Sequence, residues 1–161
     1  NPLQNAIGFT SYPFSHSLVT GTLIAAVPGL AVAYLVNPVA GVVFVGASAS
    51  HWFLDVVTHI RDLPVLGIGG SDVKVGLGLW NYPRQAFVLE LFFYVVVTVL
   101  VVQPAMVIPL LALGLAFHLI NANSFLGLSK NNPFTARQYA VAALFGFLLF
   151  IGGAAWIFAG M

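Results

Sequence analysis

The sequence predicts an all-α fold: a polytopic transmembrane helical bundle with about five membrane-spanning helices. Of its 161 residues, 60% are hydrophobic and only 6% are charged, whereas soluble domains carry about 25% charged residues. The hydrophobic residues gather in runs close to the roughly 20 residues that cross a bilayer as a helix. We therefore expect a single integral membrane domain over 1–161, with the lipid bilayer as its immediate surroundings.

Prolines mark where the expected helices end or bend. Asn37-Pro38 and Gln103-Pro104 each separate two neighbouring apolar runs, because proline fits the start of a helix and breaks its interior. Pro28 and Pro109 lie inside apolar runs, where a proline kinks a helix. The β-branched runs lack the alternation of apolar and polar residues that a barrel wall needs. The expected spans are 17–36, 39–58, 86–102, 106–121 and 138–160.

Two longer polar connections, 59–85 and 124–137, set the expected orientation. Together they carry all five lysine and arginine residues of the chain. With five spans, both connections lie on the same side as the N-terminus, and the positive-inside rule makes that side cytoplasmic. With a net charge of +1, the chain lacks the basic surface of a nucleic-acid-binding protein, so we expect no nucleic-acid partner.

Ionisable residues gather near the cytoplasmic ends of three expected spans. His51 and Asp55 are four residues apart and share one face of the second helix. His59 continues that face, His16 begins the first span, and Glu90 lies about a turn into the third. Polar groups at such positions are costly in a membrane, which makes these residues functional candidates.

Histidine and aspartate at this spacing are ligands that a divalent metal such as zinc accepts from one helix. With an open coordination position, the metal would convert a bound water into a nucleophile. The sequence has no cysteine, which excludes thiolate ligands. The spacing also fits a capped helix end, with His51 hydrogen-bonded to a neighbouring carbonyl. Both interpretations remain open from the residues alone.

Three motifs, in order along the chain, resemble those of one family. They are Ser11-Tyr12-Pro13-Phe14-Ser15-His16-Ser17-Leu18, then Ser50-His51-Trp52-Phe53-Leu54-Asp55 running on to His59-Ile60-Arg61-Asp62-Leu63-Pro64, then Gly76-Leu77-Gly78-Leu79-Trp80-Asn81. Over about residues 8–95 the chain is similar to the bacterial membrane-bound metal-dependent hydrolases, the DUF457 or YdjM-like group. The resemblance implies a bacterial inner (cytoplasmic) membrane and phosphoester substrates, including lipid-linked ones. It also places metal ligands at His16, His51 and Asp55.

The family pattern holds a further histidine and aspartate in an N-terminal helix ahead of this chain's first residue. Because the chain opens at Asn1-Pro2 rather than at methionine, we expect a segment upstream of it. The three matched ligands leave a metal with open positions.

These observations lead to one expected function and one alternative. The expected function is a metal-dependent hydrolase, with zinc as the expected metal, that cleaves an ester or phosphoester at the cytoplasmic face. Glu90 and His59 are its candidate general bases or supports of a ligand; the competing interpretations are a structural ion pair for Glu90 and an interfacial histidine in water for His59. The alternative function is a non-catalytic accessory subunit that packs against other membrane subunits in a larger complex. For His118, in the fourth span, two interpretations stay open: it lines a polar cavity or ligates a pigment or haem, or it makes an interhelical hydrogen bond to a backbone carbonyl.

Overall fold

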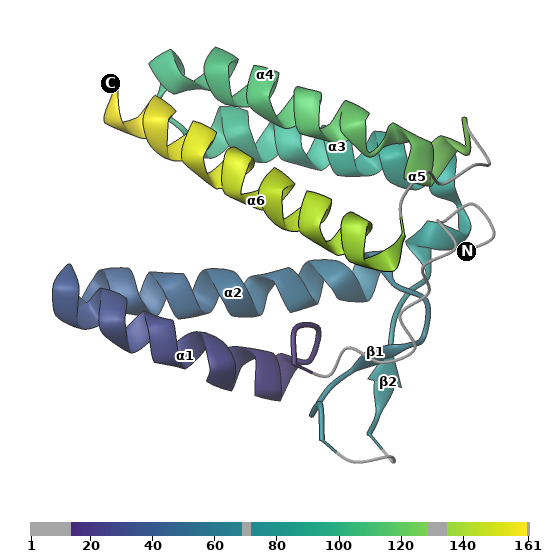
Figure 1. Ribbon diagram of the computed structural model, residues 1–161, viewed down its shortest axis with the longest axis horizontal. Coiled ribbons are helices and arrows are strands. Elements are labelled where there is room, and N and C mark those ends of the chain that lie inside the picture. Colours follow the sequence, from purple (N-terminus) through teal and green to yellow (C-terminus); the bar gives the residue numbers. More distant parts are fainter. Residues whose placement is uncertain (1–13, 69–71, 129–134, 161) are drawn as a thin grey trace. The chain divides into compact units, whose positions relative to one another are not determined.

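The computed structural model describes residues 14–68, 72–128 and 135–160. Within these residues the protein is all-α apart from one short β-hairpin (Figure 1). Four helical segments are long and apolar enough to cross a membrane, and a fifth apolar helix, at 17 residues, is slightly shorter. The predicted fold class, a multi-pass helical membrane protein, is therefore confirmed. The elements are α1 (Leu18–Leu35), α2 (Pro38–Thr58), β1 (Leu63–Pro64), β2 (Lys74–Val75), η1 (Leu79–Asn81), α3 (Pro83–Val101), α4 (Pro104–Ile120), α5 (Ala122–Leu126) and α6 (Ala136–Ala159).

The chain forms two compact units, each with its own internal contacts. The first unit contains α1, α2, the hairpin and the short 3-10 helix η1. The second contains the helices from α3 to α6. The candidate metal ligands all belong to the first unit, so its construction decides how they are placed.

Helices α1 and α2 form an antiparallel pair whose ends are set by local capping (Figure 1). The Ser17 side chain accepts a hydrogen bond from the Gly21 N–H, and the Asn37 side chain accepts one from the Ala40 N–H. Both contacts satisfy donors that the first turn of a helix leaves without a partner. Pro38 follows Asn37 at the start of α2, where a missing N–H costs nothing. Pro28 lies inside α1, and the helix continues across it.

Small residues bring the two helices close together. A Cβ added at Gly41 would meet the Ala33 Cβ at 2.5 Å and the Gly29 carbonyl oxygen at 2.7 Å. A Cβ added at Gly29 would in turn collide with the Val45 side chain. Small residues allow this approach between membrane helices, where packing rather than hydrophobic burial holds them together.

The segment expected to be a loop, 59–85, contains a two-stranded antiparallel hairpin. Leu63 pairs with Val75, and Pro64 pairs with Lys74. The Leu63 side chain is fully buried. The Trp52 indole on α2 is buried as well and donates a hydrogen bond to the Pro64 carbonyl at 2.9 Å. The indole therefore fixes β1 to α2.

The hairpin region satisfies backbone groups at the ends of both helices. At the start of α1, the Val19 N–H donates to the Val65 carbonyl at 3.0 Å. The Thr20 hydroxyl donates to the Leu66 carbonyl at 2.5 Å. At the end of α2, the carbonyl oxygens of Val56 and His59 accept hydrogen bonds of 2.7 Å from the N–H groups of Leu77 and Gly78. These bonds hold the first turn of α1 and the last turn of α2 at the same end of the unit.

Acidification is expected to loosen the hairpin through Asp72. The Leu66 and Gly67 N–H groups donate to its carboxylate and lower the pKa of Asp72 from its ordinary value of 3.8. A carboxyl whose pKa is lowered by folding stabilises the fold above its unfolded pKa, and this contribution is lost as the pH falls through the lowered value. Hydrogen exchange at the Leu66 and Gly67 amides, corrected for intrinsic rates, should therefore accelerate below about pH 3.8. Asp72→Asn should produce the same acceleration at neutral pH.

The Leu77 amide is the internal control, because it donates to a backbone carbonyl that does not titrate. If the Leu77 and Leu66 amides lost protection together at the same pH, the unit would be opening as a whole and the role given to Asp72 would be wrong.

In the second unit, α3, α4 and α6 run side by side (Figure 1). Met106 and Leu110 of α4 pack with Ile157 of α6 in a small buried core. Thr135 caps α6: its side chain accepts from the Gln138 N–H, and the Gln138 side chain accepts from the Thr135 N–H. This capping box begins α6 within the polar connection expected over 124–137. The short helix α5 lies across the start of that connection and was not predicted.

Candidate metal centre

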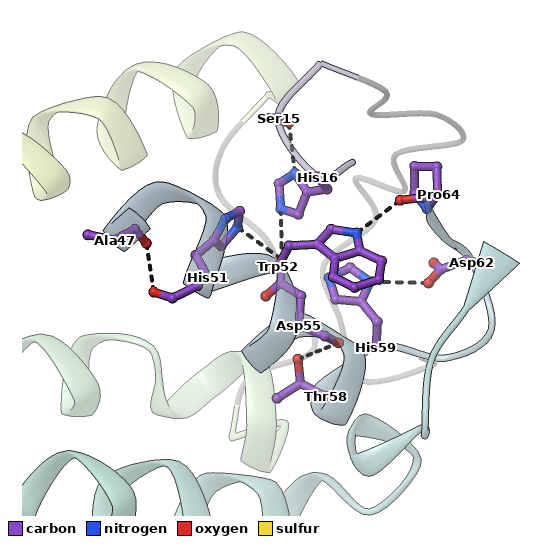
Figure 2. Close-up of polar contacts among 11 residues, drawn as sticks. Ser15, His16, Ala47, His51, Trp52, Asp55, Thr58, His59, Asp62 and Pro64 are labelled. Atoms are coloured by element: carbon purple, nitrogen blue, oxygen red, sulfur yellow. Dashed lines mark hydrogen bonds and ion pairs between the residues drawn. The ribbon is translucent and has the colours of Figure 1, made fainter. Parts of the chain in front are cut away.

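Three side chains from two segments of the first unit converge near the hairpin. His51 and Asp55 lie one turn apart on α2, and His16 directly precedes Ser17, the residue that caps α1. Each offers a ligand atom, and these atoms all lie within 4.8 Å of one another. Figure 2 shows the three side chains turned toward one another. The structure therefore brings together the three residues that the sequence proposes as metal ligands.

The Asp55 carboxylate is the centre of this group. Its Oδ2 lies 2.9 Å from the His51 Nε2 and 4.0 Å from the His16 Nε2. The His16 and His51 rings are 5.3 Å apart at 72° to each other. The two imidazoles thus approach the same carboxylate oxygen from different directions. Ligands are arranged in this way around a metal ion.

Asp55 Oδ2 is buried and accepts no hydrogen bond from any residue that the structure describes. Its contact with the His51 Nε2, at 2.9 Å, is an ion pair when that ring is protonated. A buried carboxylate oxygen without a hydrogen bond is unfavourable, and a divalent cation is a partner that removes this cost. Two imidazole nitrogens and a carboxylate oxygen also form a donor set that zinc accepts. The residues present therefore fit a divalent metal.

The surroundings of His16 favour the form of imidazole that binds a metal. Its Nδ1 lies 2.7 Å from the Ser15 Oγ, while its Nε2 faces Asp55. When a metal binds Nε2, the ring proton lies on Nδ1 and is shared with the Ser15 hydroxyl, the usual role of a second partner of a metal-binding histidine. Burial lowers the pKa of His16 from its ordinary value of 6.5. The neutral ring is consequently the main form at neutral pH.

His59 lies beside this group but in a different environment from the one expected. Only 6% of the residue is exposed, so the interpretation as an interfacial histidine in water is wrong. Its Nδ1 is 3.1 Å from the Asp62 Oδ1, its ring packs against Trp80 at 4.5 Å, and the His16 ring centroid is 5.8 Å away. His59 is buried because η1 and the hairpin fold over the end of α2, a non-local contact that its spacing from Asp55 does not reveal.

Glu90 and His118 belong to the second unit. His118 Nε2 lies 2.9 Å from the Phe87 carbonyl oxygen, which confirms the interpretation of a hydrogen bond to a backbone carbonyl. Glu90 lies on α3 and lines a cavity together with His118 and Tyr94. The catalytic roles proposed from the sequence for Glu90 and His59 stay predictions.

No protein-family model, curated protein or solved structure matches this chain.

Proposed function

We propose that this protein is a membrane-embedded metal-dependent hydrolase. In this proposal His16, His51 and Asp55 hold one divalent cation, with zinc favoured because its sites combine imidazole and carboxylate ligands. The observation that carries the proposal is the buried Asp55 Oδ2, which lies near two imidazole nitrogens and has no hydrogen bond among the described residues. A hydrogen-bonded relic of such a site would instead be expected to satisfy this oxygen within the protein.

The exposure of the two histidines supports a catalytic rather than a purely structural site. The side chains of His16 and His51 are 35% and 47% exposed, so a substrate can reach their side of the group. A metal held by three protein ligands keeps a position for water, whose pKa it lowers enough to make a nucleophile near neutral pH. Structural metal sites, in contrast, are closed by four protein ligands.

The substrate class is a proposal that rests on the resemblance to the DUF457 or YdjM-like hydrolases together with the position of the site. Asp55 lies one turn before the end of α2, which places the group near a membrane surface if α2 spans the bilayer. Ester and phosphoester bonds of lipids and lipid-linked molecules lie at that depth. The positive-inside rule assigns this face to the cytoplasm, in keeping with a bacterial inner membrane.

Metal content is the first test of the proposal. Detergent-purified protein that has never met a chelator should contain about one equivalent of zinc or another divalent metal, the loading of a mononuclear site. His51→Ala should lose it, whereas His118→Ala makes the same change outside the group and should retain it. Metal-dependent cleavage of bis(p-nitrophenyl) phosphate or p-nitrophenyl acetate, abolished in His51→Ala, would then establish hydrolysis.

Two results would contradict parts of the proposal. If the wild type, His51→Ala and His118→Ala all lacked metal even after zinc was added back, the hydrolase function would be excluded. The accessory-subunit alternative would then be favoured. If the wild type bound metal but cleaved no ester, the metal site would be supported and the catalytic role would be excluded.

A further inference from the structure

The hairpin region exposes apolar and cationic side chains together. Among its exposed residues are four apolar and two cationic ones: Leu66, Ile68, Val73 and Leu77, with Arg61 and Lys74. We call these six residues the hairpin surface. The apolar four are between 46% and 77% exposed, although they lie outside the long apolar helices. Apolar side chains that gather on a surface among polar ones mark a contact with a membrane or with another protein.

The hairpin is attached where two apolar helices end. The Val65 carbonyl accepts a hydrogen bond from the Val19 N–H in the first turn of α1, and the Leu77 N–H donates to the Val56 carbonyl near the end of α2. Both helices are long and apolar enough to cross a membrane. Figure 1 shows the two strands running crosswise to the axes of α1 and α2. With these helices across a bilayer, the hairpin therefore extends along the membrane surface instead of away from it.

The carboxylates of this unit are engaged elsewhere than with its two exposed cations. Asp72 accepts hydrogen bonds from backbone N–H groups of the hairpin. In the described part of the chain, the ion pairs of Asp55 and Asp62 are made with histidines and not with Arg61 or Lys74. The hairpin surface therefore presents positive charge beside its apolar side chains.

We propose that the hairpin surface lies in the headgroup layer of the membrane and binds anionic phospholipid there. Its apolar side chains would enter the boundary between headgroups and acyl chains. Arginine and lysine bury their aliphatic stems along apolar surface while the charged ends stay in a polar layer, where lipid phosphates lie. Protein segments that lie on a membrane bind through this combination of buried apolar area and attraction to anionic lipid.

The position and the charge of this surface favour lipid over a second copy of the chain. The hairpin continues directly from the ends of α1 and α2, whose exposed sides already meet lipid in a membrane. A symmetric pair of chains uses the same patch on both copies, so docking through the hairpin surface would bring like charges together. The proposal does not depend on the metal centre, because it uses none of the three candidate ligands.

The test reads the surroundings of one labelled position. Because the chain has no cysteine, Val73→Cys gives a single site for a bimane fluorophore, with the full chain reconstituted in vesicles. Two kinds of quencher are compared: iodide on both sides of the bilayer, and phosphatidylglycerol or phosphatidylcholine with a nitroxide near the headgroup end of an acyl chain. We expect strong quenching by the nitroxide lipids and weak quenching by iodide. Phosphatidylglycerol should be preferred by at least about fivefold, the effect of one lysine or arginine near an anionic surface.

Ile68→Cys is a second label position on the same surface. It should give the same order of quenching, so the result does not depend on how the protein tolerates the change at Val73.

Removal of the cations tests the headgroup assignment. Arg61→Gln and Lys74→Gln should each lower the preference for phosphatidylglycerol by about fivefold. Arg137→Gln removes an exposed arginine from α6, in the other unit, and should leave the preference unchanged. Stronger quenching by iodide would place the hairpin in water, and weak quenching by both kinds of quencher would mean that protein covers it. Either result would overturn the proposal, as would lipid quenching without a preference for phosphatidylglycerol or with a preference that survives both changes.

Discussion

Asp55→Asn is expected to stabilise the metal-free protein while it abolishes metal binding. The wild-type Asp55 Oδ2 is buried and has no hydrogen bond within the described part of the chain, a state that costs about 1–3 kcal/mol for a polar group. An amide removes the negative charge and supplies an N–H donor where the wild-type Oδ2 lies 2.9 Å from the His51 Nε2. We therefore expect the free energy of unfolding of the metal-free protein to rise by about 1 kcal/mol.

The same change removes the anionic ligand of the proposed site. Loss of a hydrogen-bonding partner behind a ligand already weakens metal binding about 10- to 100-fold, so loss of the ligand itself should weaken zinc binding by at least about 100-fold. Thermal unfolding without metal and zinc affinity by competition with a chromogenic chelator measure the two effects. A side chain that is kept for function can lower stability, so its replacement raises the stability and weakens zinc binding at the same time.

Asp72→Asn is the matched control, because its carboxylate accepts hydrogen bonds from the hairpin backbone. It should lower stability, and because it disturbs only the hairpin that holds the start of α1, it should weaken zinc binding by no more than about tenfold. If Asp55→Asn destabilised the metal-free protein by as much as Asp72→Asn, the carboxylate would be part of a satisfied structural network and the metal site would lose its main support.

The helices could be predicted because their signals are local. An apolar run of bilayer length needs no knowledge of its neighbours, and the proline before or after a run marks its end. The expected span 17–36 is found as Leu18–Leu35, and 39–58 as Pro38–Thr58. The third helix starts earlier than expected, at Pro83 instead of 86, since proline at the first helical position needs no N–H partner.

The hairpin could not be predicted because its bonds join residues far apart in the sequence. Its strands have two residues each, too few for an alternating pattern to show. The hydrogen bond from the Thr20 hydroxyl to the Leu66 carbonyl spans 46 residues. Nothing in the composition of 59–85 indicates that its backbone completes the ends of α1 and α2.

The candidate metal site likewise has one part that could be predicted from local spacing and one part that could not. His51 and Asp55 share a helix face, so their proximity follows from a spacing of four. His16 lies in another segment, and it entered the prediction through its depth at the start of the first span and the resemblance to a hydrolase family. The burial of His59 against Trp80 was missed, because hydropathy places a tryptophan near a span end at the interface whether or not another residue covers it.

Gly76→Ala is expected to be the most disruptive single-methyl change in the hairpin. Gly76 has φ +152°, a conformation that side chains rarely adopt. A Cβ there would collide with the carbonyl oxygen of Ile60. Backbone oxygen cannot rotate away as a side chain can, so the hairpin must move off the end of α2. This movement breaks the hydrogen bonds from Leu77 to Val56 and from Gly78 to His59.

We expect Gly76→Ala to lower the free energy of unfolding by about 2–4 kcal/mol, within the range of overpacking combined with backbone strain. Gly152→Ala is the control: in the described structure a Cβ there meets nothing within 4 Å, and alanine favours a helix over glycine by about 1 kcal/mol. Chemical denaturation in mixed micelles compares the two variants. A loss of stability in Gly152→Ala as large as in Gly76→Ala would show that the cost does not come from the hairpin.

The effect of Gly76→Ala on zinc affinity separates the two parts of the metal site. His51 and Asp55 are fixed by α2 itself, and their 2.9 Å approach does not depend on the hairpin. His16 precedes the first turn of α1, which the hairpin holds through the Val65 and Leu66 carbonyls. A displaced hairpin should therefore loosen one ligand of three and weaken zinc binding by about tenfold, the lower end of the loss caused by a misplaced support. Unchanged affinity would mean that α1 keeps His16 in place without the hairpin.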